Sequence, residues 1–141
     1  MERGSELEDQ ARKWLSVAEN LDIEEVGMIT DGSKVIGASP DGIHRNHSAL
    51  EILPCEIKVP KPSTHIMWLL EGGLPKDHKA QMHFQIAVCR ASGGYFMSYH
   101  PELEPLIVWV EADDYTDTMT HAIDKFKEDY EIAFKRIVGG E

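Results

Sequence analysis

At residues 39–42 the sequence reads SPDG, and at residues 56–60 it reads EIKVP. These two motifs lie in a stretch from Asp31 to Lys58 in which acids and a lysine follow short apolar runs. Because the side chains of a strand alternate between its two faces, Glu56 and Lys58 are expected to share one face. The stretch therefore predicts short strands whose ends bring acidic and basic groups together.

The bulk composition predicts one globular domain spanning residues 1–141. Hydrophobic residues make up 42% of the 141 residues, which suits a single compact core and argues against wholesale disorder. No apolar run approaches the roughly 20 residues that a membrane-spanning helix needs. The N-terminus also lacks a basic-then-apolar signal pattern. We therefore expect a cytoplasmic protein that is not associated with a membrane.

The net charge limits the possible partners. It is −11, from 14 basic and 25 acidic residues, which argues against broad, non-specific binding to nucleic acid. An acidic chain can still act on nucleic acid, because a site for divalent cations concentrates carboxylates and the bound ions reverse part of the local field. Any DNA-binding surface would then be local, or assembled by oligomerisation.

Hydrophobic periodicity and turn residues give the expected order of elements. We expect helices at about residues 5–19, 63–70, 76–91 and 115–138, and strands at about residues 23–29, 35–38, 50–59, 95–99 and 106–111. Asp31-Gly32 is a hairpin turn signal, whereas residues 43–49 are polar and histidine-rich and are expected to form a loop. This order predicts an α/β fold, with a central mixed β-sheet flanked by helices.

Two helices carry more specific expectations. In the first, Ser5 and Glu8 are spaced as in a capping box, and Glu8 lies close to the edge of the apolar stripe, where an acid can turn toward an interior site. The last helix carries a long apolar stripe that we expect to lie in the core. Its members are Tyr115, Met119, Ala122, Ile123, Phe126, Tyr130, Ala133, Phe134 and Ile137.

The acids and the lysine of the central stretch suit phosphodiester hydrolysis, which needs an activated water and relief of negative charge. Asp41 and Glu56, at the ends of neighbouring strands, can bracket a hard divalent cation, which prefers oxygen ligands. The Ile57 carbonyl can add a neutral ligand, and Lys58 would lie close to the attacking water or the phosphate. The alternative is that Asp41 only forms a turn, beside an exposed Glu56–Lys58 ion pair worth less than about 1 kcal/mol.

The two motifs resemble the core of the lambda-type phage exonucleases, also called YqaJ-like viral recombinases, which are PD-(D/E)xK, restriction-endonuclease-like nucleases. Residues 4–12, GSELEDQAR, are similar to the family's first active-site helix. Residues 70–73, LEGG, and the following Gln81-x-x-x-Gln85 are similar to the family's glutamine-bearing helix. The resemblance covers the chain from about Gly4 to Ile137 and implies a restriction-endonuclease-like core.

The resemblance also implies which residues hold metal. Asp41 and Glu56 would be the main ligands, together with the Ile57 carbonyl. Asp31 precedes Asp41 as the family's additional metal-binding aspartate does, and Glu8 matches an acid that faces the metals. Asp31 and Glu8 would therefore hold or tune a second ion. The expected cofactor is Mg²⁺ or Mn²⁺, with two ions in each site.

For the reaction, the resemblance implies that Lys58 assists the nucleophilic water and that Gln81 positions this water or the scissile phosphate. Family members degrade linear duplex DNA from 5′ ends and leave 3′ overhangs for a single-strand annealing protein. The best-known members close into a trimeric ring around DNA. We therefore expect a 5′ to 3′ exonuclease of phage or prophage recombination, with double-stranded DNA ends, an annealing protein and a homotrimer as the possible partners.

Two departures from the family leave other interpretations open. Family members carry extra helices before the segment that begins here at Gly4, so this chain is expected to be a minimal member, a truncation or one that recognises DNA ends differently. The connection that holds His44, Arg45 and His47 is interpreted as a mobile loop or a DNA contact. The alternative functions are an endonuclease or single-strand nuclease of the same fold, and a non-catalytic acidic interaction protein on a nuclease scaffold.

Overall fold

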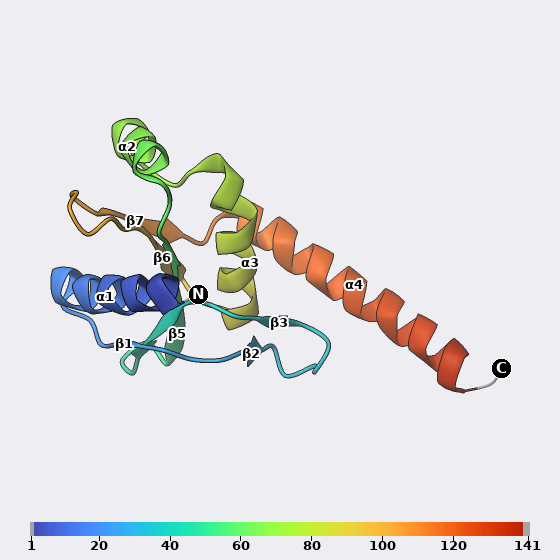
Figure 1. Cartoon of the computed structure of the whole chain (residues 1–141). Helices are drawn as coiled ribbons and strands as arrows, with labels where there is room; N and C mark the ends of the chain where they lie inside the picture. Colours follow the sequence, from blue (N-terminus) through green and yellow to red (C-terminus); the bar gives the residue numbers. More distant parts are fainter. Residues whose placement is uncertain (1, 140–141) are drawn as a thin grey trace.

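The computed structural model describes residues 2–139, with side chains from Gly4 onward, and has a mixed α/β architecture (Figure 1). The helices are α1 (Glu2–Glu19), α2 (Pro62–Glu71), α3 (Lys79–Cys89) and α4 (Asp114–Val138), with a short 3₁₀ helix η1 (Lys76–His78) before α3. The strands are β1 (Ile23–Glu24), β2 (Ile29–Thr30), β3 (Gly37–Ala38), β4 (Gly42–Asn46), β5 (Glu51–Lys58), β6 (Gly93–Ser98) and β7 (Leu106–Glu111).

A five-stranded sheet forms the centre of the molecule, in the order β1-β4-β5-β6-β7. The β5–β6 pair is parallel and the other neighbouring pairs are antiparallel, so the sheet is mixed, as the sequence predicts. In the parallel pair, Glu56 is aligned with Phe96 and Lys58 with Ser98. The strands β2 and β3 form a separate antiparallel hairpin around the predicted turn at Asp31.

Helices α1 and α3 cover opposite faces of this sheet. Leu15 of α1 belongs to a buried cluster that contains Met97 of β6. Ile86 of α3 belongs to a second buried cluster, which contains Phe96 of the same strand. Because successive side chains of a strand point to opposite faces, the neighbours Phe96 and Met97 place the two helices on the two sides of the sheet. The middle of β5 therefore lies between two helical layers.

The expectation of a loop after Gly42 is wrong for its first part. β4 occupies residues 42–46 and pairs antiparallel with β5 along its whole length. Its polar side chains hold it to the segment around β1, because His44 Nδ1 bonds the Asp22 carbonyl at 3.0 Å and Arg45 Nε donates to Glu24 Oε1 at 3.1 Å. Backbone pairing does not require apolar side chains. The polar sequence of β4 therefore lacks the hydrophobic pattern that would have predicted a strand.

Two helix starts also differ from the sequence expectation. Helix α1 begins at Glu2, so Ser5 lies inside the helix and does not cap it. The helix expected from residue 76 is divided into η1 and α3. Both differences concern the first turn of a helix, where the competing conformations are close in energy.

The apolar stripe of α4 is not in the core, which corrects the sequence expectation. Figure 1 shows α4 running away from the sheet toward the C-terminus. The exposed fractions are 54% for Phe126, 44% for Tyr130 and 51% for Phe134, whereas Ile123 packs against the buried Val88 of α3. Only the beginning of α4 is covered by the body of the molecule. Across the described residues, neither α4 nor any other helix is long and apolar enough to cross a membrane.

Candidate active site

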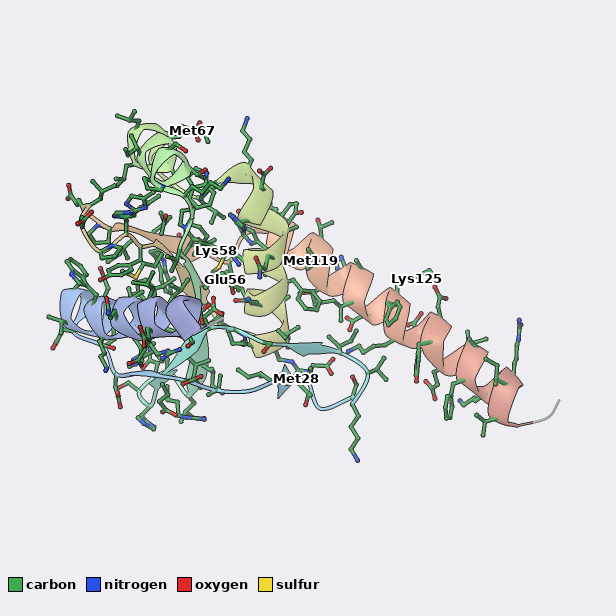
Figure 2. All side chains as sticks on the ribbon, viewed as in Figure 1. Met28, Glu56, Lys58, Met67, Met119 and Lys125 are labelled. Carbon is green, nitrogen blue, oxygen red and sulfur yellow. The ribbon has the colours of Figure 1, made fainter. Side chains whose placement is uncertain are left out.

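The centre of the site is the end of β5, where Glu56 and Lys58 lie on one face of the strand, as their spacing predicts. Figure 2 labels the two residues next to each other between α1 and α3, and Lys58 Nζ bonds Glu56 Oε1. Glu56 is only 2% exposed, whereas Lys58 is partly exposed. The pair is therefore not the surface ion pair of the alternative interpretation, because its carboxylate is buried.

Two amides of α3 complete the bonding of the Glu56 carboxylate. Gln81 Nε2 donates to Glu56 Oε1 at 2.9 Å, and Gln85 Nε2 donates to Glu56 Oε2 at 2.7 Å. The glutamines are one helical turn apart and so project from the same face of α3. Together with Lys58 they stabilise a buried negative charge that would otherwise be costly.

Asp41 lies between β3 and β4, next to this carboxylate. Its Oδ2 accepts a hydrogen bond of 2.8 Å from the backbone N–H of Ile57. Because the N–H and C=O of one strand residue point to the same side, the Ile57 carbonyl also lies on the Asp41 side of β5. At Gly42, a Cβ atom would come within 2.8 Å of the Ile23 side chain, so the glycine of the SPDG motif permits this close packing.

Arg12 holds the Asp41 turn against α1. Its Nε donates to the Asp41 carbonyl at 3.1 Å, and its Nη1 bonds Asp9 at 3.1 Å. Arg12 is buried although it is charged, which is tolerated because its donors have oxygen partners. This contact fixes the position of the turn relative to the helix that also carries Glu8.

The electrostatics of Asp41 bring Glu8 into the site. The pKa of Asp41 is raised to about 6, mainly by burial and further by the negative charges of Glu56 and Glu8. The hydrogen bond from the Ile57 N–H and the charge of Lys58 act in the opposite direction, but they do not cancel the rise. The negative charges of Glu56 and Glu8 thus act on Asp41 from two other segments, and a divalent cation would relieve that repulsion.

Asp31 is not joined to this network. Its Oδ2 bonds Lys127 Nζ of α4 at 2.9 Å, and its Oδ1 accepts from the Ser33 N–H at 3.0 Å. The bonds to Ser33 and Lys127 lower the pKa of Asp31 to about 2. The structure therefore brings Asp41, Glu56, Lys58 and Gln81 together, while Asp31 ties the β2–β3 turn to α4.

Comparisons with known proteins place the chain in a family. The family model of the YqaJ-like viral recombinase domain matches residues 1–93. The chain belongs to this family. A search among curated proteins finds no match.

Two crystal structures are similar to this chain over 99% of its length. One is an alkaline exonuclease, LHK-Exo, from Laribacter hongkongensis, with 30% sequence identity, a TM-score of 0.69 and 74% of that chain covered. The other is LHK-Exo in complex with dAMP, with 28% identity, a TM-score of 0.71 and the same 74% coverage. They confirm the α/β fold, with a central mixed sheet flanked by helices, that the sequence predicts.

The donor atoms of this YqaJ-like domain fit a hard cation. Among the side chains that the structure describes, residues 4–139, no group of three or more His, Cys, Asp and Glu lies close enough together to form a ready-made metal site. The site instead offers the carboxylates of Asp41 and Glu56 and the carbonyl of Ile57. Mg²⁺ is commonly held by one or two carboxylates and keeps several waters, so this oxygen-only set fits Mg²⁺ or Mn²⁺.

Arg12 and Gln85 both contact the site, although the sequence patterns assign neither of them a role. For Gln85 the signal was its spacing of one helical turn from Gln81. For Arg12 the signal was its spacing of one helical turn from Glu8, on the helix that faces the acids. Neither spacing reveals whether the side chain is buried, which depends on the packing of α1 and α3.

Proposed function

We propose that this YqaJ-like domain is a Mg²⁺- or Mn²⁺-dependent exonuclease that hydrolyses linear double-stranded DNA in phage or prophage recombination. Family membership supports a nuclease role in recombination. The observation that carries the proposal is the buried Glu56 carboxylate, which accepts hydrogen bonds from Lys58 and Gln81 beside Asp41. A buried acid that is bonded by both a cation and an amide is more typical of a site for phosphoryl chemistry than of a group that only stabilises the fold.

A divalent ion held by Asp41, Glu56 and the Ile57 carbonyl would supply Lewis acidity and lower the pKa of water. Lys58, with a side chain 30% exposed, can reach from Glu56 to the solvent side of the site. There its ammonium group would orient the attacking water and stabilise the charge that develops on the phosphate. Gln81 would position this water or the scissile phosphate through its side-chain amide.

A second ion would use the charge of Glu8, which already acts on Asp41. Asp31 would become a ligand only if its carboxylate gave up the bonds to Lys127 and Ser33. Glu8 is therefore the acid that we propose for the second metal position, with Asp31 contributing only after that rearrangement.

The proposal also covers the direction of DNA degradation and the oligomeric state of the protein. LHK-Exo is an exonuclease solved with dAMP, which supports a site that accepts a deoxynucleotide. We propose 5′ to 3′ degradation that leaves 3′ overhangs for an annealing protein, carried out in the cytoplasm by a homotrimeric ring. The net charge of −11 supports such an assembly, because an acidic monomer has little basic surface for DNA.

A second candidate is a non-catalytic interaction protein on the same scaffold. The acidic charge and the exposed apolar side chains of α4 favour it. The retention of Asp41, Glu56, Lys58 and Gln81 in one network argues against it, since a site without a catalytic role has no need to keep all four.

The test is a cleavage assay with two DNA substrates, a linear 5′-phosphorylated duplex and closed circular duplex DNA, each with Mg²⁺ or with EDTA. The proposal predicts release of nucleotides from the linear duplex with Mg²⁺ only, while the closed circle stays intact. Cutting of the closed circle would indicate an endonuclease. No cleavage of either substrate with Mg²⁺ or Mn²⁺ would support the interaction protein.

A further inference from the structure

Gln85 and Gln81 hold different oxygens of the same carboxylate. Gln81 is exposed and bonds Glu56 Oε1, which Lys58 also contacts. Gln85 is 3% exposed and bonds Glu56 Oε2 at 2.7 Å. Gln81 and Lys58 therefore bond the oxygen on the accessible side of Glu56, whereas Gln85 holds the other oxygen from inside the protein.

The other atom of the Gln85 amide has no hydrogen-bond partner. Gln85 Oε1 is buried without a partner, and it is the one such side-chain atom found among the described residues. Turning the amide over would not help, because Oε1 would then face a carboxylate oxygen and the two acceptors would repel each other. The fold thus keeps an unsatisfied acceptor in order to keep the Nε2 donor on Glu56, and such atoms often mark functional sites in native proteins.

We propose that Gln85 is a positioning residue that fixes the rotation of the Glu56 carboxylate for metal binding. This inference rests on the proposed function. A carboxylate rotates easily about its last side-chain bond, and the buried bond from Gln85 removes this freedom. Glu56 Oε1 then stays on the side of Lys58 and Gln81, where it would be available to hold the ion. Outer partners that orient a metal ligand typically change metal affinity or activity by about 10- to 100-fold.

The test measures Mn²⁺ binding by isothermal titration calorimetry, which reports on the site without requiring catalysis. Gln85→Leu keeps a side chain of similar volume, removes the donor to Glu56 and also removes the unsatisfied acceptor. We expect it to bind Mn²⁺ about tenfold or more weakly and to stay folded in EDTA, with a lower melting temperature because Glu56 Oε2 loses its buried donor. The matched control is Gln10→Leu, because Gln10 is an exposed residue of α1; its Mn²⁺ affinity should equal that of the unaltered chain.

A kinetic readout separates positioning from a general loss of structure. In Gln85→Leu, the Mn²⁺ concentration needed for half-maximal DNA cleavage should rise about tenfold, while the KM for DNA at saturating Mn²⁺ stays the same. Gln85→Met provides a second variant with a flexible apolar side chain that adapts to its surroundings. If both variants fail to fold, Gln85 is a structural residue and the inference is wrong.

Two further outcomes distinguish this inference from the proposed function. If Gln85→Leu is folded and binds Mn²⁺ as tightly as the unaltered chain, Gln85 does not position Glu56, although the proposed nuclease function stands. If the unaltered chain itself binds no Mn²⁺, the proposed metal-dependent function fails and the inference fails with it.

Discussion

The β5–α3 site buries polar side chains, whereas the helix α4 leaves apolar side chains exposed. At the site, the acid Glu56 and the amide Gln85 are almost fully buried. On α4, the rings of Phe126, Tyr130 and Phe134 stack on one another, with centroids 6.3 and 6.0 Å apart, yet remain about half exposed. Burial here follows from what each element packs against. Polar groups are buried where each finds a partner, and apolar groups stay exposed where no element covers them.

The largest expected effect is on the rate of DNA cleavage, which should depend on a lysine of the site but not on a lysine of α4. Lys58→Ala removes the cation that contacts Glu56, so Mg²⁺-dependent cleavage of linear duplex DNA should fall by about 100-fold or more. Lys125→Ala should cleave at the unaltered rate, because Lys125 is exposed and bonds Asp129 on the same helix. Initial rates, with circular dichroism as the check of folding, measure the difference; equal rates for the two variants would contradict the mechanism.

Next in size is the stability difference between two phenylalanines. Phe96 is fully buried, whereas Phe134 is 51% exposed. Phe96→Ala should therefore lower the free energy of unfolding by about 3–5 kcal/mol, and Phe134→Ala should change it by only about 0.5 kcal/mol. Urea unfolding followed by circular dichroism measures both. A large loss in Phe134→Ala would show that α4 is covered in solution, and size measurement would then identify a second copy.

Asp41 should lower the stability of the metal-free chain. Its pKa of about 6 lies above its ordinary value of 3.8, so the folded state binds the proton more tightly. The contribution of Asp41 to stability in EDTA therefore falls as the pH rises from about 4 to about 6. Asp41→Asn should raise the melting temperature in EDTA at neutral pH and remove the further rise that Mn²⁺ causes by binding the folded state.

The matched control for Asp41 is Asp129→Asn on α4, which should behave as the unaltered chain in both buffers. Thermal melts followed by circular dichroism give all of these temperatures. If Mn²⁺ still raised the melting temperature of Asp41→Asn to the full extent, the ion would bind elsewhere.

The smallest expected effect concerns Asp31 and Lys127, which join the β2–β3 turn to α4. The pKa of Asp31 is lowered from 3.8 to about 2 by its bonds to Ser33 and Lys127. The contribution of this lowered pKa to stability is therefore present above about pH 4 and is lost as the pH falls toward 2. Lys127→Met should slightly lower the melting temperature at pH 7 and have little effect near pH 2. No loss at pH 7 would mean that the contact does not hold α4 in solution.

The sequence predicted the parts of the site that depend on local geometry. Strand alternation placed Glu56 and Lys58 on one face, and the SPDG motif placed Asp41 in a turn beside β5. Helical spacing placed Gln81 and Gln85 on one face of α3. These predictions needed only short segments, because the repeat of a strand or helix fixes which neighbouring side chains share a face.

The sequence did not predict the features that depend on contacts between distant segments. The apolar stripe of α4 predicted a helix correctly but not its exposure, because periodicity does not specify what covers a face. β4 was missed because its polar side chains find partners around β1. Tertiary packing likewise places Asp31 beside Lys127, which lies far along the chain. It also buries Arg12 and Gln85.

The most direct test of the central claim is the release of nucleotides from a linear 5′-phosphorylated duplex by the unaltered chain, followed in time with Mg²⁺ and after addition of EDTA. We expect steady release with Mg²⁺ that stops when EDTA is added. No release with Mg²⁺, or release that continues unchanged in EDTA, would contradict the assignment of Asp41, Glu56 and Lys58 to a metal-dependent nuclease site.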